Sequence, residues 1–536
     1  MLWFEHIITV PILLPLLLGA LLMLIDERQY QVKFWLSFFS VGLLLWAAGW
    51  LLVSIDTHPQ HIPVFSYQAA NWPAPFGISL VVDRLSALML VLVACVALAA
   101  LGFSYRRWAR AGVHYHSLFM LLLMGMNGAL LTGDLFNLFV FFEVMLAASY
   151  GLLLHGKNTV RVRAGMNFIT LNLIAAFFFL MGIALIYAAT GTLSLADLAV
   201  KSRQLLGIDK ALFEAGLTVL AVTFLAKSGM WPLGFWMPKT YSAAAPPIAA
   251  MLTLVTKVGV YVIYRLWLLL ATDVNDSFTI LGSQLLFGMG LATMFYASLG
   301  LLAERNAQRM VSYSAMLSSG MLVALLGVAH SSLIAEALFY WVSSALAVAA
   351  FMLLLELTDQ LYSPQSIQRA AVLQSLNDEE AQEETPGVVI PAAMAFLGLS
   401  FIGCSLVVAG VPPLSGFVAK FGIILGLLSL WEDISTLNTV VFIVMLLLSG
   451  AFAIVAFMRL GVRAFWSSSK SPAPKLPWSA ASPIMLLLTL CAGMAILAGP
   501  VQGYMNRASA DLGGEQNYIN AVLGVRQKAI SHGEYQ

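Results

Sequence analysis

Apolar segments long enough to cross a lipid bilayer recur along the whole chain, and this recurrence limits the fold more than any other feature. A transmembrane helix needs about 20 mostly apolar residues, and only helices and closed barrels satisfy their backbone hydrogen bonds inside a bilayer. The segments cover approximately residues 3–25, 34–55, 78–104, 117–132, 134–155, 165–190, 211–230, 246–271, 278–303, 310–329, 333–357, 389–430, 438–460 and 479–501. They predict an all-α, polytopic membrane protein with about 14 transmembrane helices.

The composition agrees with this prediction and narrows the possible partners. Of the 536 residues, 60% are hydrophobic and 10% are charged. The lipid bilayer is therefore an expected partner, whereas a net charge of +1 gives no indication of a nucleic-acid partner. The three cysteines lie inside apolar segments, and the eight histidines lie in loops or near helix ends. We therefore expect no disulfide, no metal, haem or iron–sulfur site, and no other cofactor.

The segment 389–430 is ambiguous, because roughly 42 residues of helix would measure about 63 Å against a hydrocarbon core of about 30 Å. It could form one broken span or two complete spans. With one broken span and both termini outside, sixteen of the 27 Lys and Arg residues lie in inside loops and six lie outside. Two complete spans would weaken this bias to about fifteen against seven, so the positive-inside rule favours the broken span.

Two apolar segments are interrupted by similar Gly/Pro sequences, Gly229-Met230-Trp231-Pro232 and Gly410-Val411-Pro412-Pro413. Paired interruptions of this kind indicate a transporter built from inverted repeats, with its site at the broken helices. We predict two inverted five-helix repeats, formed by helices four to eight and nine to thirteen. The domains would be an N-terminal three-helix region (1–116), the first repeat (117–271), the second repeat (272–465), and a last transmembrane helix with a polar tail (466–536).

Four ionisable residues fall inside the predicted helices away from their ends: Glu143, Lys227, Lys257 and Lys420. Each would cost roughly 2.5 to 3.5 kcal/mol at the bilayer centre, and together on the order of 10 kcal/mol if nothing paired, hydrated or neutralised them. They could be structural groups bonded to neighbouring helices. We favour a functional interpretation, in which they carry protons, because a buried lysine can lose and regain its proton far more easily than a solvated one.

For other polar and charged residues near helix ends, a functional role is less strongly indicated. Asp83 and Arg84 lie at the outer end of the third helix, and Arg265 lies within two turns of a helix end. Local pairing or snorkelling would explain all three. His330, at an outer helix end, is either a surface group or a proton port, and Glu336, early in the eleventh helix, is equally open to a structural or an access role.

At these residues the chain resembles the antiporter-like subunits shared by multisubunit Mrp-type Na+/H+ antiporters and respiratory complex I, and most closely the D-type branch of the Mrp subunits. The similar motifs are the fifth-helix sequence 132–143, Ala226-Lys227-Ser228-Gly229 with Trp231-Pro232, Thr256-Lys257-Val258-Gly259, and Pro412-Pro413-Leu414-Ser415-Gly416-Phe417 through Lys420. The resemblance covers nearly the whole chain. It implies that Glu143 and Lys227 form a buried ion pair and that Lys257 and Lys420 continue a hydrated proton path.

The chain departs from complex I relatives at two places. Thr240-Tyr241 stands where those relatives often carry His, so Tyr241 is a further candidate for proton or ion access, and Ser343-Ser344 stands where His is expected in the eleventh helix. The proton exit could then depend on water and hydroxyl groups. A lysine at 420, where the middle antiporter-like chain of complex I tends to carry Glu, favours the D-type branch.

The resemblance implies a proton-translocating subunit of a multi-pass antiporter complex in the bacterial inner membrane. Its partners would be other small and large membrane subunits, and it would exchange H+ for Na+, with K+ or Li+ as alternatives. One alternative is a proton-pumping subunit of a redox complex, such as an NADH–quinone oxidoreductase or a membrane-bound hydrogenase. Another is a membrane scaffold that transports nothing, in which all four mid-helix charges would tolerate neutral replacements.

Overall fold

A computed structural model describes residues 6–57, 64–156, 159–271, 276–328, 330–361, 392–432, 435–465 and 476–531. The first half of the chain forms α2 (Val10–Leu24), α3 (Tyr30–Thr57), β1 (Val64–Gln68), β2 (Ser79–Asp83), α4 (Arg84–Ser104), α5 (Tyr115–Leu131), α6 (Leu135–Leu153), α7 (Thr159–Thr190), α8 (Leu195–Lys201), α9 (Gly207–Lys227), α10 (Met237–Ala243) and α11 (Pro246–Leu270). The second half forms α12 (Ser277–Ala303), α13 (Ala307–Gly327), α14 (Ser331–Leu361), α16 (Ala392–Ala409), α17 (Ser415–Ser429), α18 (Thr436–Phe465), α19 (Trp478–Ile496), α20 (Ala498–Gly513) and α21 (Glu515–Ser531).

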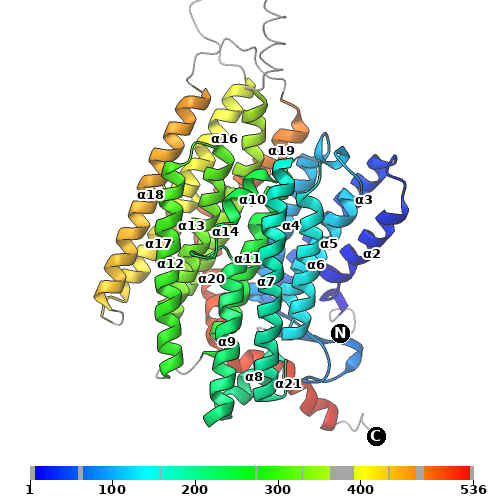
Figure 1. Cartoon of the computed structure of the whole chain (residues 1–536), viewed down its shortest axis with the longest axis vertical. Coiled ribbons are helices and arrows are strands. Elements are labelled where there is room, and N and C mark those ends of the chain that lie inside the picture. The colour runs from blue at the N-terminus through cyan, green and yellow to red at the C-terminus, as the bar shows by residue number, and fades with distance from the viewer. Residues whose placement is uncertain are drawn as a thin grey trace, which may run out of the picture.

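The long helices stand side by side as one bundle (Figure 1). Among the described residues, eleven helices are long and apolar enough to cross a membrane, and α2, α5 and α17 are shorter apolar helices. The prediction of an all-helical, multi-pass membrane protein is confirmed. The figure of about 14 crossings and the inverted repeats stay predictions.

α11 and α14 occupy the centre of the bundle. Their most apolar 18-residue stretches are 100% buried, against 39% for α3 and α7 and 33% for α19. The rim helices instead expose large apolar side chains, such as Phe39 at 68%, Phe177 at 67% and Leu447 at 58%. Lipid can cover these side chains. Polar residues on α11 and α14, by contrast, are screened from both lipid and water.

The segment 389–430 is divided into α16 and α17, which follow one another from the upper toward the lower end of the bundle (Figure 1). The start of α17 overlaps the end of α16, since a Cβ on Gly416 would lie 1.9 Å from the Val407 carbonyl oxygen. The helix is therefore broken here, and α16 alone is long and apolar enough to cross a membrane whereas α17 is shorter; that the two form one span stays a prediction. The acidic segment 362–391 lies outside the described residues.

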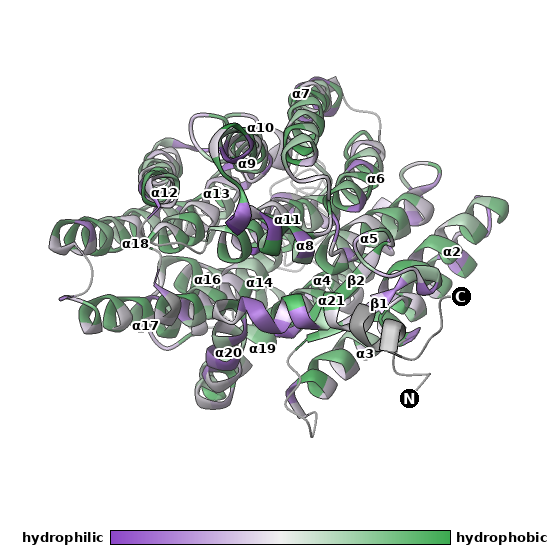
Figure 2. Ribbon diagram, turned by 90° about the horizontal axis from the view of Figure 1, so that it is seen from below, coloured by the Kyte–Doolittle hydropathy of each residue, from purple (hydrophilic) through white to green (hydrophobic). Residues whose placement is uncertain are grey.

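Two features of the lower end were not predicted. β1 and β2 form an antiparallel pair, with Val64 opposite Asp83, and the polar tail is helical, forming α20 and α21. These two helices carry hydrophilic stretches across the lower face, whereas the rim helices are mainly hydrophobic (Figure 2). α21 is tied to β1 where the Ser66 hydroxyl donates to the Ala521 carbonyl at 2.6 Å.

Candidate functional site: a charged and hydroxylated centre

Glu143 lies on α6, eight residues after the first residue of that helix and therefore about 12 Å along it. Asp134 caps α6 by accepting a hydrogen bond from the Asn137 amide at 2.9 Å. Glycines on α5 let α6 approach closely, because a Cβ on Gly128 would lie 2.2 Å from the Phe141 ring. The Glu143 side chain is half-buried, and its Oε1 atom is buried with no hydrogen-bond partner among the described residues. A carboxylate in this position is available to bind a proton.

Lys227 is the last residue of α9, where the negative end of the helix dipole favours a cation. It is 4% exposed, and its Nζ has no hydrogen-bond partner in the described chain. Nζ lies 5.4 Å from the centre of the Phe142 ring, next to Glu143 in the sequence. The charges of Lys227 and Glu143 are close enough to interact, but across the described residues no ion pair within 4.0 Å joins them. The structure therefore brings the two groups together without direct contact.

The break after Lys227 satisfies the backbone groups that the end of α9 leaves free. Gly229 has a φ of +74°, a conformation that a side chain disfavours. Its amide donates to the Ala226 carbonyl at 3.1 Å, and the Trp236 indole donates to the same carbonyl at 3.3 Å. The Trp231 amide donates to the Thr293 hydroxyl of α12 at 3.0 Å. The break is thus fixed by neighbouring groups, and none of these bonds uses the Lys227 ammonium.

Lys257 lies near the middle of α11, at the centre of the bundle, and is 4% exposed. Its ammonium donates to the hydroxyls of Ser318 and Ser319 on α13, at 3.1 Å for Ser319. The end of α9 packs against the same part of α11, because a Cβ on Gly259 would lie 2.6 Å from the Ser228 hydroxyl and 3.6 Å from the Lys227 carbonyl carbon. Lys227 and Lys257 therefore lie on directly packed segments.

Lys420 lies on α17 and reaches back to the end of α16. Its ammonium donates to the carbonyls of Val408 at 3.2 Å and Ala409 at 2.9 Å, and the residue is 5% exposed. These are carbonyls that the break leaves without helical partners, so the lysine replaces those partners and interacts with the negative end of the α16 dipole. Gly410, with φ +79°, lies against the lysine side chain.

Hydroxyl groups connect the central helices between Lys257 and α17. The Ser318 and Ser344 hydroxyls are 3.0 Å apart, and those of Ser343 and Ser415 are 2.8 Å apart. The departure from complex I relatives pointed to Ser343-Ser344 but not to Ser318 or Ser415. The adjacent serines Ser318-Ser319, inside an apolar helix, were a signal that could have pointed to Ser318.

The three candidate access residues lie in different surroundings. Tyr241 on α10 is 1% exposed, and its hydroxyl donates to the Leu252 carbonyl of α11 at 2.5 Å. His330 is partly exposed in the turn before α14, with Nδ1 2.9 Å from the Ser332 hydroxyl. Glu336 is partly buried and accepts a hydrogen bond from Gln502 of α20 at 2.7 Å. Tyr241 therefore belongs to the buried centre, whereas His330 and Glu336 lie toward the lower face.

The remaining helix charges form ion pairs at the lower end of the bundle. Arg265 Nη1 lies 2.6 Å from Asp83 Oδ2, and Arg84 lies 3.1 Å from Asp56 and 2.5 Å from Asp511. These contacts agree with the structural interpretation of Asp83, Arg84 and Arg265.

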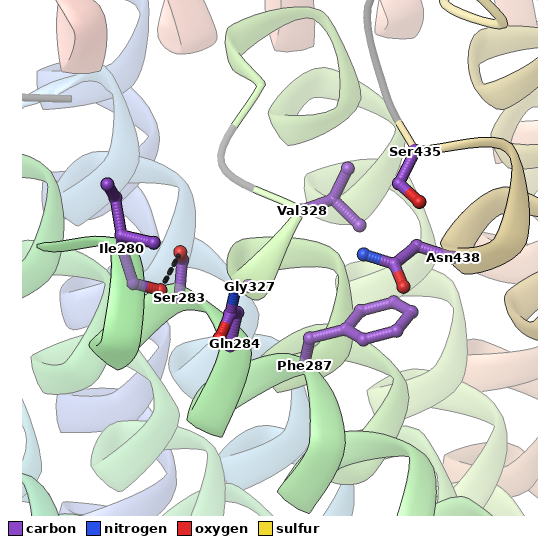
Figure 3. Close-up of a pocket in the computed structure, with 8 residues that line it drawn as sticks. All are labelled: Ile280, Ser283, Gln284, Phe287, Gly327, Val328, Ser435 and Asn438. Atoms are coloured by element: carbon purple, nitrogen blue, oxygen red, sulfur yellow. Dashed lines mark hydrogen bonds between the residues drawn. The ribbon is translucent and has the colours of Figure 1, made fainter. Parts of the chain in front are cut away.

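A cavity of about 610 Å³ opens among the ends of α12, α13 and α18 (Figure 3). Its polar side chains are Ser283, Gln284, Ser435 and Asn438. The Ser283 hydroxyl donates to the Ile280 carbonyl at 2.9 Å. None of the residues lining it is titratable, so this cavity has no acidic or basic side chain that could hold a proton.

Known proteins are similar to this chain in sequence and in fold. Residues 132–449 match the family described as NADH:quinone oxidoreductase/Mrp antiporter, TM. A probable K+/H+ antiporter subunit of the D type from Rhizobium meliloti is 44% identical over 97% of this chain and 98% of its own length. A Na+/H+ antiporter subunit of the D type from Alkalihalophilus pseudofirmus is 30% identical over 97% and 99% of the two chains. A chain of the Mrp complex from Dietzia sp. DQ12-45-1b has the same fold, with a TM-score of 0.79, 22% identity, and coverage of 97% and 99%.

Proposed function

Because this chain belongs to the NADH:quinone oxidoreductase/Mrp antiporter transmembrane family, we propose that it is the D-type subunit of an Mrp antiporter and moves protons across the bacterial inner membrane. It acts together with other membrane subunits, and the complex exchanges H+ for a monovalent alkali cation. The relatives' names support both Na+ and K+ as that cation. Glu143, Lys227, Lys257 and Lys420 carry the protons.

One observation carries the proposal: three buried lysines lie in the bundle centre and, among the described residues, none has a carboxylate within 4.0 Å. A lysine held only for stability would be expected to sit in a closed ion pair, because a buried unpaired charge is costly. Lys257 and Lys420 instead bind neutral hydroxyls and carbonyls, and the Lys227 ammonium has no hydrogen-bond partner in the described chain. Such amines can exist with or without their proton, which a proton carrier requires.

The order of the proton sites along the path follows from which segments pack against one another. Glu143 lies beside Lys227, Lys227 lies on a segment packed against the Lys257 helix, and hydroxyl groups lie between Lys257 and α17. His330, Glu336 and Tyr241 are the candidate points of entry or exit. A change in the protonation of one site alters the charge felt by the next, so the sites titrate as a coupled set.

The test is cation/H+ exchange in everted membrane vesicles that contain the whole complex. Lys257→Ala and Glu143→Gln are expected to abolish the collapse of a pH gradient on addition of Na+ or K+. Lys210→Ala is the control, because Lys210 lies at the start of α9 and pairs with Asp276 at 2.8 Å, away from the centre. Exchange at the unsubstituted rate by both centre variants, with partner subunits still co-purifying, would refute the proposal.

The same purification tests the alternative that the family description also names, a subunit of an NADH:quinone oxidoreductase-like complex. Co-purification of flavin and iron–sulfur subunits would support that alternative. Co-purification of membrane subunits without redox centres, together with exchange in the absence of an electron donor, would support the antiporter.

A further inference from the structure

Four buried serines form two hydroxyl pairs at the centre of the bundle, and we call them the bridge serines: Ser318 on α13, Ser343 and Ser344 on α14, and Ser415 at the start of α17. They are 2%, 0%, 6% and 0% exposed, respectively. They come from three helices, one of which, α14, is fully enclosed by protein. Neither lipid nor bulk water therefore surrounds them.

The first pair begins at Lys257. The lysine ammonium donates to the Ser318 hydroxyl, and the Ser318 and Ser344 oxygens are 3.0 Å apart. Ser344 in turn donates to the Trp341 carbonyl at 3.1 Å. A continuous hydrogen-bonded chain thus runs from α11 through α13 to α14.

The second pair continues from α14 to α17. The hydroxyls of Ser343 and Ser415 are 2.8 Å apart. Ser415 lies five residues before Lys420, about 7.5 Å along the same helix. Because Ser343 and Ser344 are neighbours in the sequence, the two pairs meet on adjacent residues of α14.

Hydroxyl-to-hydroxyl contacts between helices distinguish these serines from Ser319, which accepts only the Lys257 ammonium across helices in the described chain, and from several other buried serines. Ser149, Ser298, Ser314 and Ser449 each donate to a carbonyl of their own helix. A hydroxyl bonded only to a carbonyl has no acceptor that can take and release a proton. A hydroxyl bonded to another hydroxyl can accept one proton while it gives up another, because it is both a donor and an acceptor.

We propose that the bridge serines carry protons between Lys257 and Lys420, an inference that rests on the proposed function. The Lys257 ammonium gives one proton to the Ser318 oxygen while Ser318 passes its own proton to Ser344. Lys257 becomes a neutral amine, and Ser318 remains a neutral alcohol. Ser344 passes a proton in the same way to the Ser343–Ser415 pair through a water molecule, and Lys420 in its amine form receives it through a second water.

Replacement of Ser344 is the most direct test, because Ser344 is one hydroxyl removed from Lys257 and does not touch the lysine. In vesicles containing the whole complex, Ser344→Ala is expected to lower cation/H+ exchange by up to about tenfold, the factor that one neutral hydrogen bond is worth. Ser344→Thr keeps the hydroxyl and should restore most of the rate. Ser343→Ala should resemble Ser344→Ala, and the double variant should be no slower than either, since both act in one series.

Ser314→Ala is the matched control. Ser314 lies one turn before Ser318 on α13 and is 1% exposed, and within the described ranges its hydroxyl bonds only the Met310 carbonyl, at 3.2 Å. It should keep the unsubstituted rate. If Ser344→Ala fails to assemble with its partner subunits, Ser344→Cys provides the same test with a weak thiol donor of similar size.

The outcomes separate this inference from the proposed function. Normal exchange by Ser344→Ala and Ser343→Ala, with exchange abolished in Lys257→Ala, would overturn the serine bridge and leave the function intact. Normal exchange by Lys257→Ala would overturn the bridge, and normal exchange by both Lys257→Ala and Glu143→Gln would overturn the proposed function as well. Equal loss in Ser314→Ala and Ser344→Ala, or no rescue by Ser344→Thr, would show that α13 and α14 packing, and not proton transfer, sets the rate, and would also overturn the bridge.

Discussion

Replacement of Gly410 by alanine should disable the second broken helix through its lysine. Gly410 has a φ of +79°, and an alanine there costs about 1 to 2 kcal/mol in backbone energy. The new Cβ would also lie 2.4 Å from Lys420 Cδ and 3.2 Å from its Nζ. Since real Cβ atoms essentially never approach other atoms to 2.4 Å, the Lys420 side chain has to shift.

The hydrogen bonds that the Lys420 ammonium loses account for the larger part of the expected destabilisation. The ammonium gives up two hydrogen bonds, to the Val408 and Ala409 carbonyls. Hydrogen bonds to charged groups are each worth roughly 1.5 to 3 kcal/mol, so the displacement adds about 3 to 6 kcal/mol to the backbone cost. We expect Gly410→Ala to lower the thermal unfolding midpoint of the purified complex and to remove most cation/H+ exchange in vesicles.

Gly191→Ala separates the two contributions. Gly191 also has a positive φ, +66°, but a Cβ there has no neighbour within 4 Å. It therefore imposes the backbone cost without moving a lysine, and it should keep nearly full exchange with a small drop in the midpoint. If Gly410→Ala and Gly191→Ala show the same midpoint and the same exchange rate, the reasoning about Lys420 is wrong.

Three further predictions concern the lower and upper ends of the bundle. Glu336→Gln should slow exchange severalfold and alter its pH profile if Glu336 is an access group, whereas Gln502→Leu should act weakly; an unchanged profile for Glu336→Gln would exclude that role. Arg265→Leu should destabilise the complex by about 3 to 5 kcal/mol, because it leaves the buried Asp83 unpaired; heat stability equal to that of the unsubstituted complex would contradict this. Glu27 lies in the loop before α3. Burial alone would raise its pKa, but hydrogen bonds from the Lys33 ammonium and the His114 backbone amide lower the pKa below the ordinary 4.5. The stability it contributes is fully present above pH 4.5 and is lost as the pH falls through the lower pKa of the folded state, so Glu27→Gln should flatten the acid limb of a thermal-stability profile.

Much of the fold could be predicted from the apolar segments. Inside a bilayer a long apolar stretch has hardly any alternative to a helix, and the Gly229 and Gly410 breaks stood out because glycine and proline interrupt such stretches. The β1–β2 pair escaped prediction because Val64–Gln68 is short and its register is set by pairing with a strand that begins only at Ser79. The helical form of 502–531 escaped because this segment is polar and crosses the lower face of the bundle, so it carries no apolar stretch of bilayer length.

The residues of the candidate site could be singled out by type from the sequence, but their contacts could not. Glu143, Lys227, Lys257 and Lys420 were recognisable because a charge in an apolar helix is costly wherever it points. The bonds that hold them were not recognisable, because Ser318 lies 61 residues from Lys257 and a serine in a helix usually bonds its own backbone. The separation between Glu143 and Lys227 also depends on helix packing, which the local sequence does not determine.

Among the described residues no carboxylate lies within 4.0 Å of the three lysines, and this has an electrostatic consequence for the cation that the proposed antiporter would exchange. An alkali ion about 10 Å from one protonated lysine is repelled by about 1.7 kcal/mol at an effective dielectric constant of roughly 20, and several protonated lysines add to this. The centre of the bundle therefore acts as a barrier to Na+ or K+ whenever its amines are charged. Discharge of the amines would lower that barrier, so proton occupancy of this subunit would itself decide when an alkali ion can pass nearby.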